Sequence, residues 1–218
     1  MKKVKISLVL NILIVLFVIL GCFFMFTGIK FMKETMLLSS TKIGMLRFYT
    51  VDSNILMGLT SILFIIFDIK VLKGKIEKIP TWVHNVKLFG TSGVTLTFLV
   101  TACFLGPLYG YYAMYNNSNL LFHLVVPLLS ISSFIFTENY EVKYKYSFIG
   151  IISMIIYGIY YMTNVMLHLV DGKPTWEYDF YGFLQGNIYN MFIALPILLL
   201  GTLLISFILL VLNKKFLK

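Results

Sequence analysis

The segment Tyr49-Thr50-Val51-Asp52-Ser53-Asn54 is a polar hexapeptide at the head of an apolar run that reaches about Ile69. Polar and ionisable side chains are costly inside a bilayer. A cluster of them at membrane depth therefore indicates a functional site, provided that the rest of the chain supplies a partner. The partner that this sequence offers is His123.

The rest of the chain has the composition of a membrane protein. It has 218 residues, of which 59% are hydrophobic and 12% charged, and its mean hydropathy is +0.90. A helix needs about 20 apolar residues to cross a hydrocarbon core of about 30 Å. The sequence predicts an all-α, polytopic integral membrane protein with one domain over residues 1–218. Its six transmembrane helices are expected at about residues 6–29, 49–69, 86–108, 119–137, 147–167 and 190–212.

Two segments near the N-terminus allow more than one interpretation. The first apolar run is too long for the core of a signal peptide and lacks a clear cleavage site, so we expect it to be the first membrane helix. The segment from Lys30 to Phe48 mixes apolar and charged residues. It either lies at the interface as an amphipathic piece, or the second helix begins as early as Ile43.

The basic residues predict the orientation of the chain. Of the eighteen Lys and Arg residues, thirteen flank the helices on the side of the two termini and five on the other side. Because cytoplasmic loops carry the excess of Lys and Arg, both termini are expected in the cytoplasm. The net charge of +9 comes from short clusters between apolar runs, which excludes a basic groove for nucleic acid. His84 falls in a cytoplasmic flank and is expected to be solvated.

The two cysteines carry no signal of metal or redox chemistry. Cys22 and Cys103 lie in separate apolar runs, without a CxxC motif or a His/Cys pair at metal-ligand spacing. They are expected to be inert thiols, and neither a metal nor another cofactor is expected.

The predicted orientation brings two reactive side chains to the same leaflet. Thr50 lies near the outer start of the second helix, and His123 lies about one turn into the fourth. Proline at position 127 removes the N–H that would bond the carbonyl of residue 123, and such freed backbone in a membrane usually lines a cavity. We expect an outer-leaflet cavity between the second, fourth and fifth helices. Its supporting or substrate-binding residues are expected to be Asp52, Ser53, Asn54, Asn119, Tyr161, Asn164 and His168.

These residue types point to acyl chemistry at the membrane interface. A threonine hydroxyl needs a base within hydrogen-bond reach, and a neutral imidazole can take its proton and return it to a leaving group. Asn54 or Asn119 could orient the imidazole or donate to a developing oxyanion. Asp52 lies about 200° around the helix from Thr50 and need not face the same cavity.

Each residue also has a purely structural interpretation. A membrane threonine often bonds the carbonyl four residues earlier. Asp52 is favoured by the dipole at a helix N-terminus, and the tyrosines of the fifth helix suit an interfacial belt.

Two motifs resemble a known family. They are Arg47-Phe48-Tyr49-Thr50-Val51-Asp52-Ser53-Asn54 and Leu121-Phe122-His123-Leu124-Val125-Val126-Pro127, with weaker likeness over residues 95–107 and at Trp176-Glu177-Tyr178. On a six-span chain, they resemble the androgen-induced-gene and androgen-dependent TFPI-regulating protein family and related bacterial six-span proteins. The animal members hydrolyse fatty acid esters of hydroxy fatty acids with an intramembrane threonine and histidine. The resemblance puts these at Thr50 and His123.

The function expected from the residues and the resemblance together is an intramembrane threonine hydrolase. It would act on fatty acyl esters in the plasma membrane of a bacterium, with membrane lipids or an acyl ester as its partners. The alternative is a non-catalytic protein that binds or transports a lipid or small solute through the same polar cavity.

Overall fold

The computed structural model describes residues 1–33 and 40–216, and in these ranges the chain is helical apart from turns and loops. Part of the segment that was expected to be amphipathic lies outside the described residues. Six helical spans are long and apolar enough to cross a membrane, which confirms the predicted architecture at that level. They are Lys2–Thr27, Tyr49–Leu72, Thr81–Tyr109, Asn117–Thr137, Tyr144–Leu167 and Ile188–Phe216.

Three of the spans are single long helices with short additions. The first span is α1 (Lys2–Thr27), the second is α2 (Tyr49–Leu72), and the sixth is α10 (Met191–Phe216), preceded by a 3₁₀ turn at Ile188–Asn190. A separate 3₁₀ turn, Lys42–Arg47, comes before α2 and is divided from it by Phe48, whose backbone is extended. The second helix therefore does not begin at Ile43.

The other three spans are divided into shorter helices. The third joins α3 (Thr81–Val100) to α4 (Gly106–Tyr109), and α5 (Tyr111–Met114) follows it. The fourth joins α6 (Asn117–Leu120) to α7 (Val126–Thr137), and the fifth joins α8 (Ser147–Gly150) to α9 (Ile152–Leu167). The third and fourth spans carry a break near the end of the bundle that lies away from the two chain termini, called the outer end below, and the candidate site lies beside these breaks.

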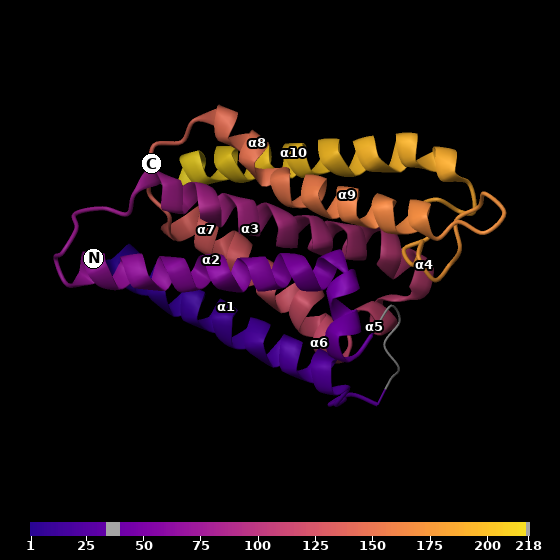
Figure 1. Cartoon of the computed structure of the whole chain (residues 1–218). Helices are drawn as coiled ribbons and strands as arrows, with labels where there is room; N and C mark the ends of the chain where they lie inside the picture. Colours follow the sequence, from indigo (N-terminus) through magenta and orange to yellow (C-terminus); the bar gives the residue numbers. More distant parts are fainter. Residues whose placement is uncertain (34–39, 217–218) are drawn as a thin grey trace.

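The third span is the centre of the bundle. In Figure 1, α3 and α7 lie between α1 and α2 on one side and α9 and α10 on the other, and both chain termini lie at the same end. In the most apolar 18-residue stretch of the third span, 61% of the residues are buried, compared with 28% in the first and sixth spans. Small and hydroxyl side chains make this possible because they let neighbouring backbones approach closely. The buried set on α3 includes Gly90, Thr91, Ser92, Gly93, Thr95 and Thr97.

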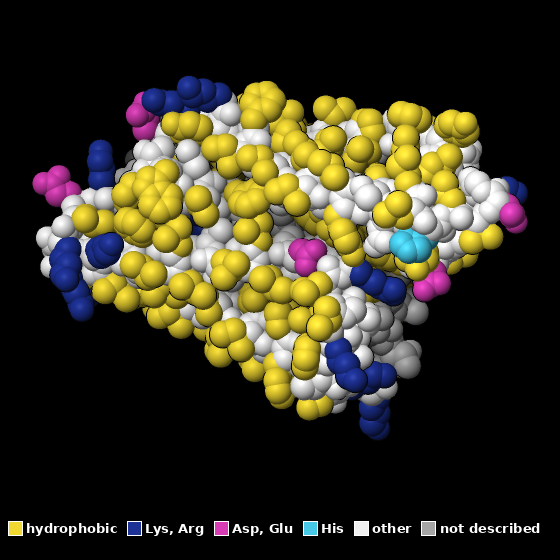
Figure 2. Space-filling model, in the orientation of Figure 1, with side chains coloured by type: hydrophobic (Ala, Val, Ile, Leu, Met, Phe, Trp, Pro, Cys, Tyr) yellow, Lys and Arg dark blue, Asp and Glu magenta, His cyan; other side chains and the backbone are white. Residues whose placement is uncertain are grey.

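The outside of the bundle is apolar along its length. Large aliphatic side chains on α1, α2, α9 and α10 are exposed, and Figure 2 shows the Lys and Arg side chains gathered towards the ends of the helices. This distribution suits a bilayer around the middle and water at both ends.

The fourth span contains a π turn at Leu121–Val125. The N–H of Val126 bonds the carbonyl of Leu121, five residues earlier, so the carbonyl of Phe122 loses its usual donor. The residue five positions after Phe122 is Pro127, which has no N–H to offer. Asn54 on α2 replaces the lost donor, because its Nδ2 donates to the Phe122 carbonyl at 3.1 Å.

The third span repeats this arrangement at Thr101–Leu105. The N–H of Gly106 bonds the Thr101 carbonyl, and Pro107 follows. The carbonyl of Ala102 is thereby freed, and the hydroxyl of Tyr111 donates to it at 3.0 Å. In both spans a π turn and a proline together release one carbonyl, which a side chain then satisfies.

The sequence predicted one released carbonyl in the fourth span, that of His123, and did not predict that of Phe122. Proline alone would free the carbonyl of His123, whereas the carbonyl that receives a side-chain donor is that of Phe122. The extra residue in the π turn causes the difference, since it lengthens each hydrogen bond from four residues to five.

A polar network fills the opposite, inner end of the bundle between α1, α2 and α3. The ammonium group of Lys87 is buried and donates to Asn11 Oδ1 and, at 3.0 Å, to Ser61. Asn11 Nδ2 donates to Ser7 Oγ at 3.2 Å, and Ser7 donates to the carboxylate of Asp68 at 2.9 Å. This chain of hydrogen bonds connects a buried cation to a buried anion through two neutral side chains.

His84 belongs to the same inner end and is not solvated, contrary to the expectation from sequence. It is 1% exposed, its Nδ1 lies 3.2 Å from Glu138, and its ring stacks on Tyr140 at 4.4 Å. Burial raises the pKa of the Glu138 carboxyl, while the bond from His84 and the charge of Lys87 oppose that rise. A flanking residue is drawn inside because Glu138, at the end of α7, gives its imidazole a partner.

We expect the valine substitution Gly21→Val to destabilise the protein because α1 passes very close to the π turn. A Cβ at Gly21 would clash with the Phe122 ring. Overpacking of this kind costs about 1–3 kcal/mol. Thermal unfolding of the purified protein in detergent measures the effect. The matched control is Gly201→Val on α10, where nothing lies within 4 Å of the new Cβ, and an equal loss in both variants would contradict the prediction.

The inner network predicts strong coupling between Lys87 and Asp68. Removing one member of a buried charge pair costs about 3–5 kcal/mol because the other charge loses its compensation. Lys87→Met should therefore lower the unfolding temperature sharply. The double variant Lys87→Met/Asp68→Leu should lose less than the sum of the two single variants. The control Lys73→Met, at an exposed position, should change little, and strictly additive losses would show that the network does not couple the two charges.

Candidate functional site

Thr50 lies in the first turn of α2, and its backbone is held by two side chains. Ser53 Oγ donates to the Thr50 carbonyl at 3.2 Å, and Asn54 Nδ2 donates to the same carbonyl at 2.7 Å. Ser53 also contacts Thr97 of α3 at 3.1 Å, and Asn54 reaches the Phe122 carbonyl. These two predicted supporting residues thus fix the start of α2 against both the third and the fourth spans, and with it the position of Thr50.

The hydroxyl of Thr50 differs from those of several other Thr and Ser residues of the bundle. Within residues 1–33 and 40–216, hydroxyls that donate to the carbonyl four residues earlier include those of Thr95, Thr97, Ser130 and Thr137. Thr50 has no such bond in the same ranges. Its hydroxyl is therefore not engaged in the bond that the structural interpretation of a membrane threonine requires.

His123 lies on the π turn of the fourth span and is 5% exposed. Its Nδ1 is 2.7 Å from the carbonyl oxygen of Met114. A carbonyl only accepts hydrogen bonds, so Nδ1 carries the proton and Nε2 carries the lone pair of a neutral imidazole. This tautomer is the one in which Nε2 can act as a base.

Thr50 and His123 line the same small cavity at the outer end of the bundle. Asn119 and Tyr181 also border it, and the rest of its wall is apolar, made by Met25, Phe48, Val51, Leu105 and Met114. Its volume of about 10 Å³ is close to the minimum for one water molecule. Two side chains 73 positions apart in the sequence thus border one enclosed space.

Tyr181 comes from the loop between α9 and α10, and a buried carboxylate fixes that loop. Asp179 accepts hydrogen bonds from the hydroxyl of Tyr161 at 2.6 Å and from the backbone N–H groups of Leu184 and Gln185 at 3.0 and 3.2 Å. Tyr161, expected to line the cavity, holds this loop and also lines a cavity between α9 and α10.

The hydroxyl of Tyr181 lies against the N-terminus of α2. Burial raises the pKa of Tyr181 to about 12, and the Thr50 hydroxyl and the backbone N–H groups of Tyr49 and Thr50 partly offset that rise. The first N–H groups of a helix have no carbonyl partner within it. The Thr50 hydroxyl and the first N–H groups of α2 therefore donate towards the Tyr181 oxygen, which lies beside them.

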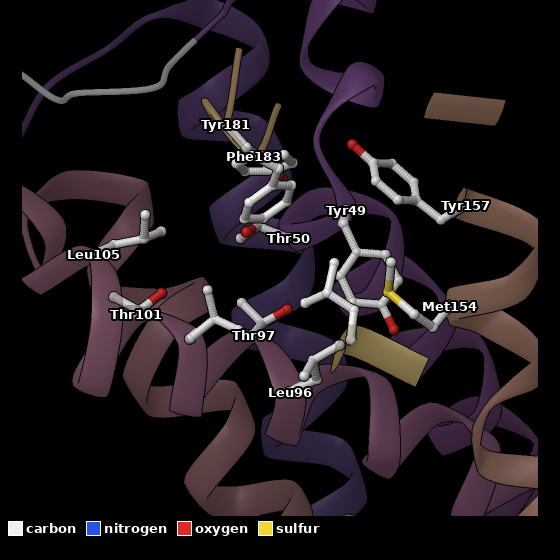
Figure 3. Close-up of a pocket in the computed structure, with 12 residues that line it drawn as sticks. Tyr49, Thr50, Leu96, Thr97, Thr101, Leu105, Met154, Tyr157, Tyr181 and Phe183 are labelled. Carbon is white, nitrogen blue, oxygen red and sulfur yellow. The ribbon is translucent and has the colours of Figure 1, made fainter. Parts of the chain in front are cut away.

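A second cavity continues from Thr50 into the bundle. Its volume is about 40 Å³, and it shares Thr50, Leu105 and Tyr181 with the cavity of His123. Figure 3 shows Thr50 beneath Tyr181 and Phe183, with Thr97 and Thr101 across the space. A third cavity shares Met154, Tyr157, Phe183 and Leu198 with the second and lies between α9 and α10.

These three cavities form a row from His123 to the gap between the last two spans. Apart from the hydroxyls of Thr50, Thr97, Thr101 and the tyrosines, the second and third have apolar walls. The row is polar at the end near His123 and largely apolar at the other.

Asp52, Asn164 and His168 neither line the His123 cavity nor bond the carbonyl of Thr50. Asp52 is half-buried and borders a separate groove between α2 and α9. Asn164 bonds Tyr160 and, through its carbonyl, the imidazole of His168, which is exposed and stacks on Tyr178 at 3.8 Å. The spacing of three and four residues along a helix put Asn164 and His168 on the outer half of the fifth span. In the structure, this face of α9 is turned towards the loop that follows it.

Sequence reasoning missed the two groups that complete the surroundings of the site, the phenol of Tyr181 and the carbonyl of Met114. The run of aromatic residues Tyr178, Phe180, Tyr181 and Phe183 in the last loop was a signal that this loop packs onto the bundle. Nothing in the sequence marks the Met114 carbonyl, which is a backbone atom.

The comparisons with known proteins leave the site to be judged on its geometry, since neither a protein family, nor a curated protein, nor a solved structure matches this chain.

Proposed function

We propose that this chain is an integral protein of a bacterial plasma membrane that hydrolyses fatty acyl esters, with Thr50 as nucleophile and His123 as base. The observation that carries the proposal is that Thr50 and His123 line one cavity while the Met114 carbonyl holds the imidazole in the tautomer with a free Nε2 lone pair. The excess of basic residues on the side of the termini supports a cytoplasmic location for both.

The proposed reaction has two steps. Nε2 of His123 takes the proton of the Thr50 hydroxyl as Oγ attacks the ester carbonyl carbon, and then returns it to the leaving alkoxide, so that an alcohol departs and an acyl-threonine remains. Water, activated by the same nitrogen, then attacks the acyl-threonine and releases a fatty acid and the free hydroxyl. The Tyr181 phenol and the first N–H groups of α2 are suited to stabilise the oxyanion of both steps.

The row of cavities supports an acyl substrate. An ester group at Thr50 would place a hydrocarbon chain along Leu96, Met154 and Leu198, towards the gap between α9 and α10. The apolar walls would contribute about 0.8 kcal/mol for each buried CH₂ group. A substrate could reach this gap sideways from the bilayer, without crossing the loop that Asp179 holds.

We expect a fluorophosphonate probe to label Thr50 and the labelling to depend on both residues. Thr50→Ala and His123→Ala should each reduce the labelling rate by about 100-fold or more, because one removes the nucleophile and the other its base. Thr50→Ser should retain labelling. Peptide mass spectrometry of the adduct gives the labelled residue.

The matched control is Thr101→Ala, which removes a hydroxyl from the adjoining cavity and should label like the native protein. Thermal unfolding shows that each variant is folded. Equal labelling of Thr50→Ala would contradict the nucleophile. A native protein that binds a fatty acyl ester but neither reacts with the probe nor hydrolyses the ester would be the non-catalytic lipid binder instead.

The loop offers a separate prediction. Tyr181→Phe removes the phenol beside Thr50 and keeps the ring that closes the cavity. Loss of a single oxyanion donor costs about 100- to 1,000-fold in turnover, so hydrolysis of a fatty acyl ester should fall within that range while the unfolding temperature changes little. Tyr178→Phe, in the same loop but stacked on His168, is the control and should retain activity. Unchanged turnover in Tyr181→Phe would show that its hydroxyl does not touch the reacting group.

A further inference from the structure

A lateral groove between α2 and α9 holds a carboxylate that the proposed reaction does not use. The groove has a volume of about 310 Å³, and Asp52 of α2, Phe89 of α3 and Ile156 of α9 are among its walls. In Figure 2 an acidic side chain stands out within the apolar face of the bundle. The rings of Tyr49 and Tyr157 border both this groove and the cavity that continues from Thr50, so they separate the two spaces.

The charge of Asp52 has no counter-ion in the described part of the chain. The ion pairs found there are His84 with Glu138 and Lys143 with Glu141. Arg47 is the basic residue next to Asp52 in sequence, but its guanidinium lies over the rings of Phe48 and Phe180, at 4.8 and 5.0 Å. A half-buried carboxylate without a cation is costly in apolar surroundings, so the groove favours a positively charged occupant.

An aromatic wall borders the groove beside this carboxylate. The ring centroids of Tyr49 and Tyr157 are 5.1 Å apart, and those of Tyr157 and Tyr160 are 5.9 Å apart. The hydroxyl of Tyr49 bonds Ser153, and that of Tyr157 donates to the Arg47 carbonyl. Because these two hydroxyls are engaged, Tyr49 and Tyr157 present their rings to the groove. Aromatic rings next to a carboxylate attract bulky, weakly hydrated cations such as organic ammonium groups.

We propose that this groove binds an organic ammonium group, with Asp52 as its counter-ion and the rings of Tyr49, Tyr157 and Tyr160 as its aromatic wall. A small metal ion fits less well, because no cluster of three or more His, Cys, Asp or Glu side chains that could hold one occurs among the residues that the structure describes. Exposed aliphatic side chains continue from the groove along both helices, at Leu59 and at Ile159. An ammonium group attached to a hydrocarbon tail would therefore satisfy both the carboxylate and the surface beside it.

The test separates two sources of such a group, a lipid headgroup and a soluble amine. The full-length protein is placed in nanodiscs of equal parts phosphatidylethanolamine and phosphatidylglycerol, and native mass spectrometry counts the lipids that it retains. The native protein should retain the amine lipid over the anionic lipid by about ten-fold, and Asp52→Asn should abolish this preference. In parallel, tetramethylammonium chloride is compared with sodium chloride for its effect on the unfolding temperature.

Two further variants test the aromatic wall. Tyr160→Phe keeps the ring and should behave like the native protein, whereas Tyr160→Leu should weaken binding. A preference for the amine lipid that depends on Asp52 assigns the groove to a headgroup, and stabilisation by tetramethylammonium that depends on Asp52 assigns it to a soluble amine. Either result supports the proposal.

Three results would overturn the proposal. They are the absence of both effects in the native protein, effects that survive Asp52→Asn, and a native dimer that becomes a monomer in Asp52→Asn. The last result would mean that a second copy of the chain covers the groove. Ester hydrolysis is measured separately, so failure here leaves the Thr50 proposal standing.

Discussion

The hydrogen bond from Asn54 to the carbonyl of Phe122 is the contact on which the outer half of this bundle depends. A carbonyl released from a helix inside an apolar bundle must find a donor, because water is not there to supply one. The π turn and Pro127 release this carbonyl, and Asn54 satisfies it while also bonding the carbonyl of Thr50. One amide group therefore joins the backbone next to the candidate base to the backbone of the candidate nucleophile.

Both ends of the molecule bury polar groups, but the partners of these groups differ. At the inner end, Lys87, Asp68, His84 and Glu138 are all buried. Lys87 is connected to Asp68 through two neutral side chains, and His84 contacts Glu138 directly. At the outer end the polar groups border cavities, with Thr50 and His123 at one and Asp52 at another. Asp68, His84 and Glu138 also line a pocket of about 360 Å³ at the inner end, so polar groups that could meet a ligand face space at both ends.

Much of the architecture could be predicted from the sequence, because a span of about 20 apolar residues leaves little choice of structure. The six spans, the face shared by Thr50, Ser53 and Asn54, and the interruption at Pro127 were all visible. The π turns were not, since one extra residue in a helix leaves no clear mark on the hydrophobic pattern. For the same reason the sequence did not reveal that the carbonyl of Phe122 is released.

The remaining differences come from long-range packing. Tyr181 reaches Thr50 only because Asp179 folds the last loop back onto α9, and His84 is buried only because Glu138 lies opposite it. Neither fact follows from local spacing. Asn164 and His168 were assigned to the cavity from helical periodicity, which gives the face of a helix but not the neighbour that the face meets.

The paired π turns also divide the third and fourth spans into segments that are rotated independently. An α-helix turns by about 100° for each residue, so one inserted residue changes which side chains the outer segment presents without altering the inner one. In the fourth span, Ser130 and Ser133 stay packed in the bundle while His123 faces the cavity. The inner segments thus keep their own packing, while the π turns set which side chains the outer segments turn towards the cavities.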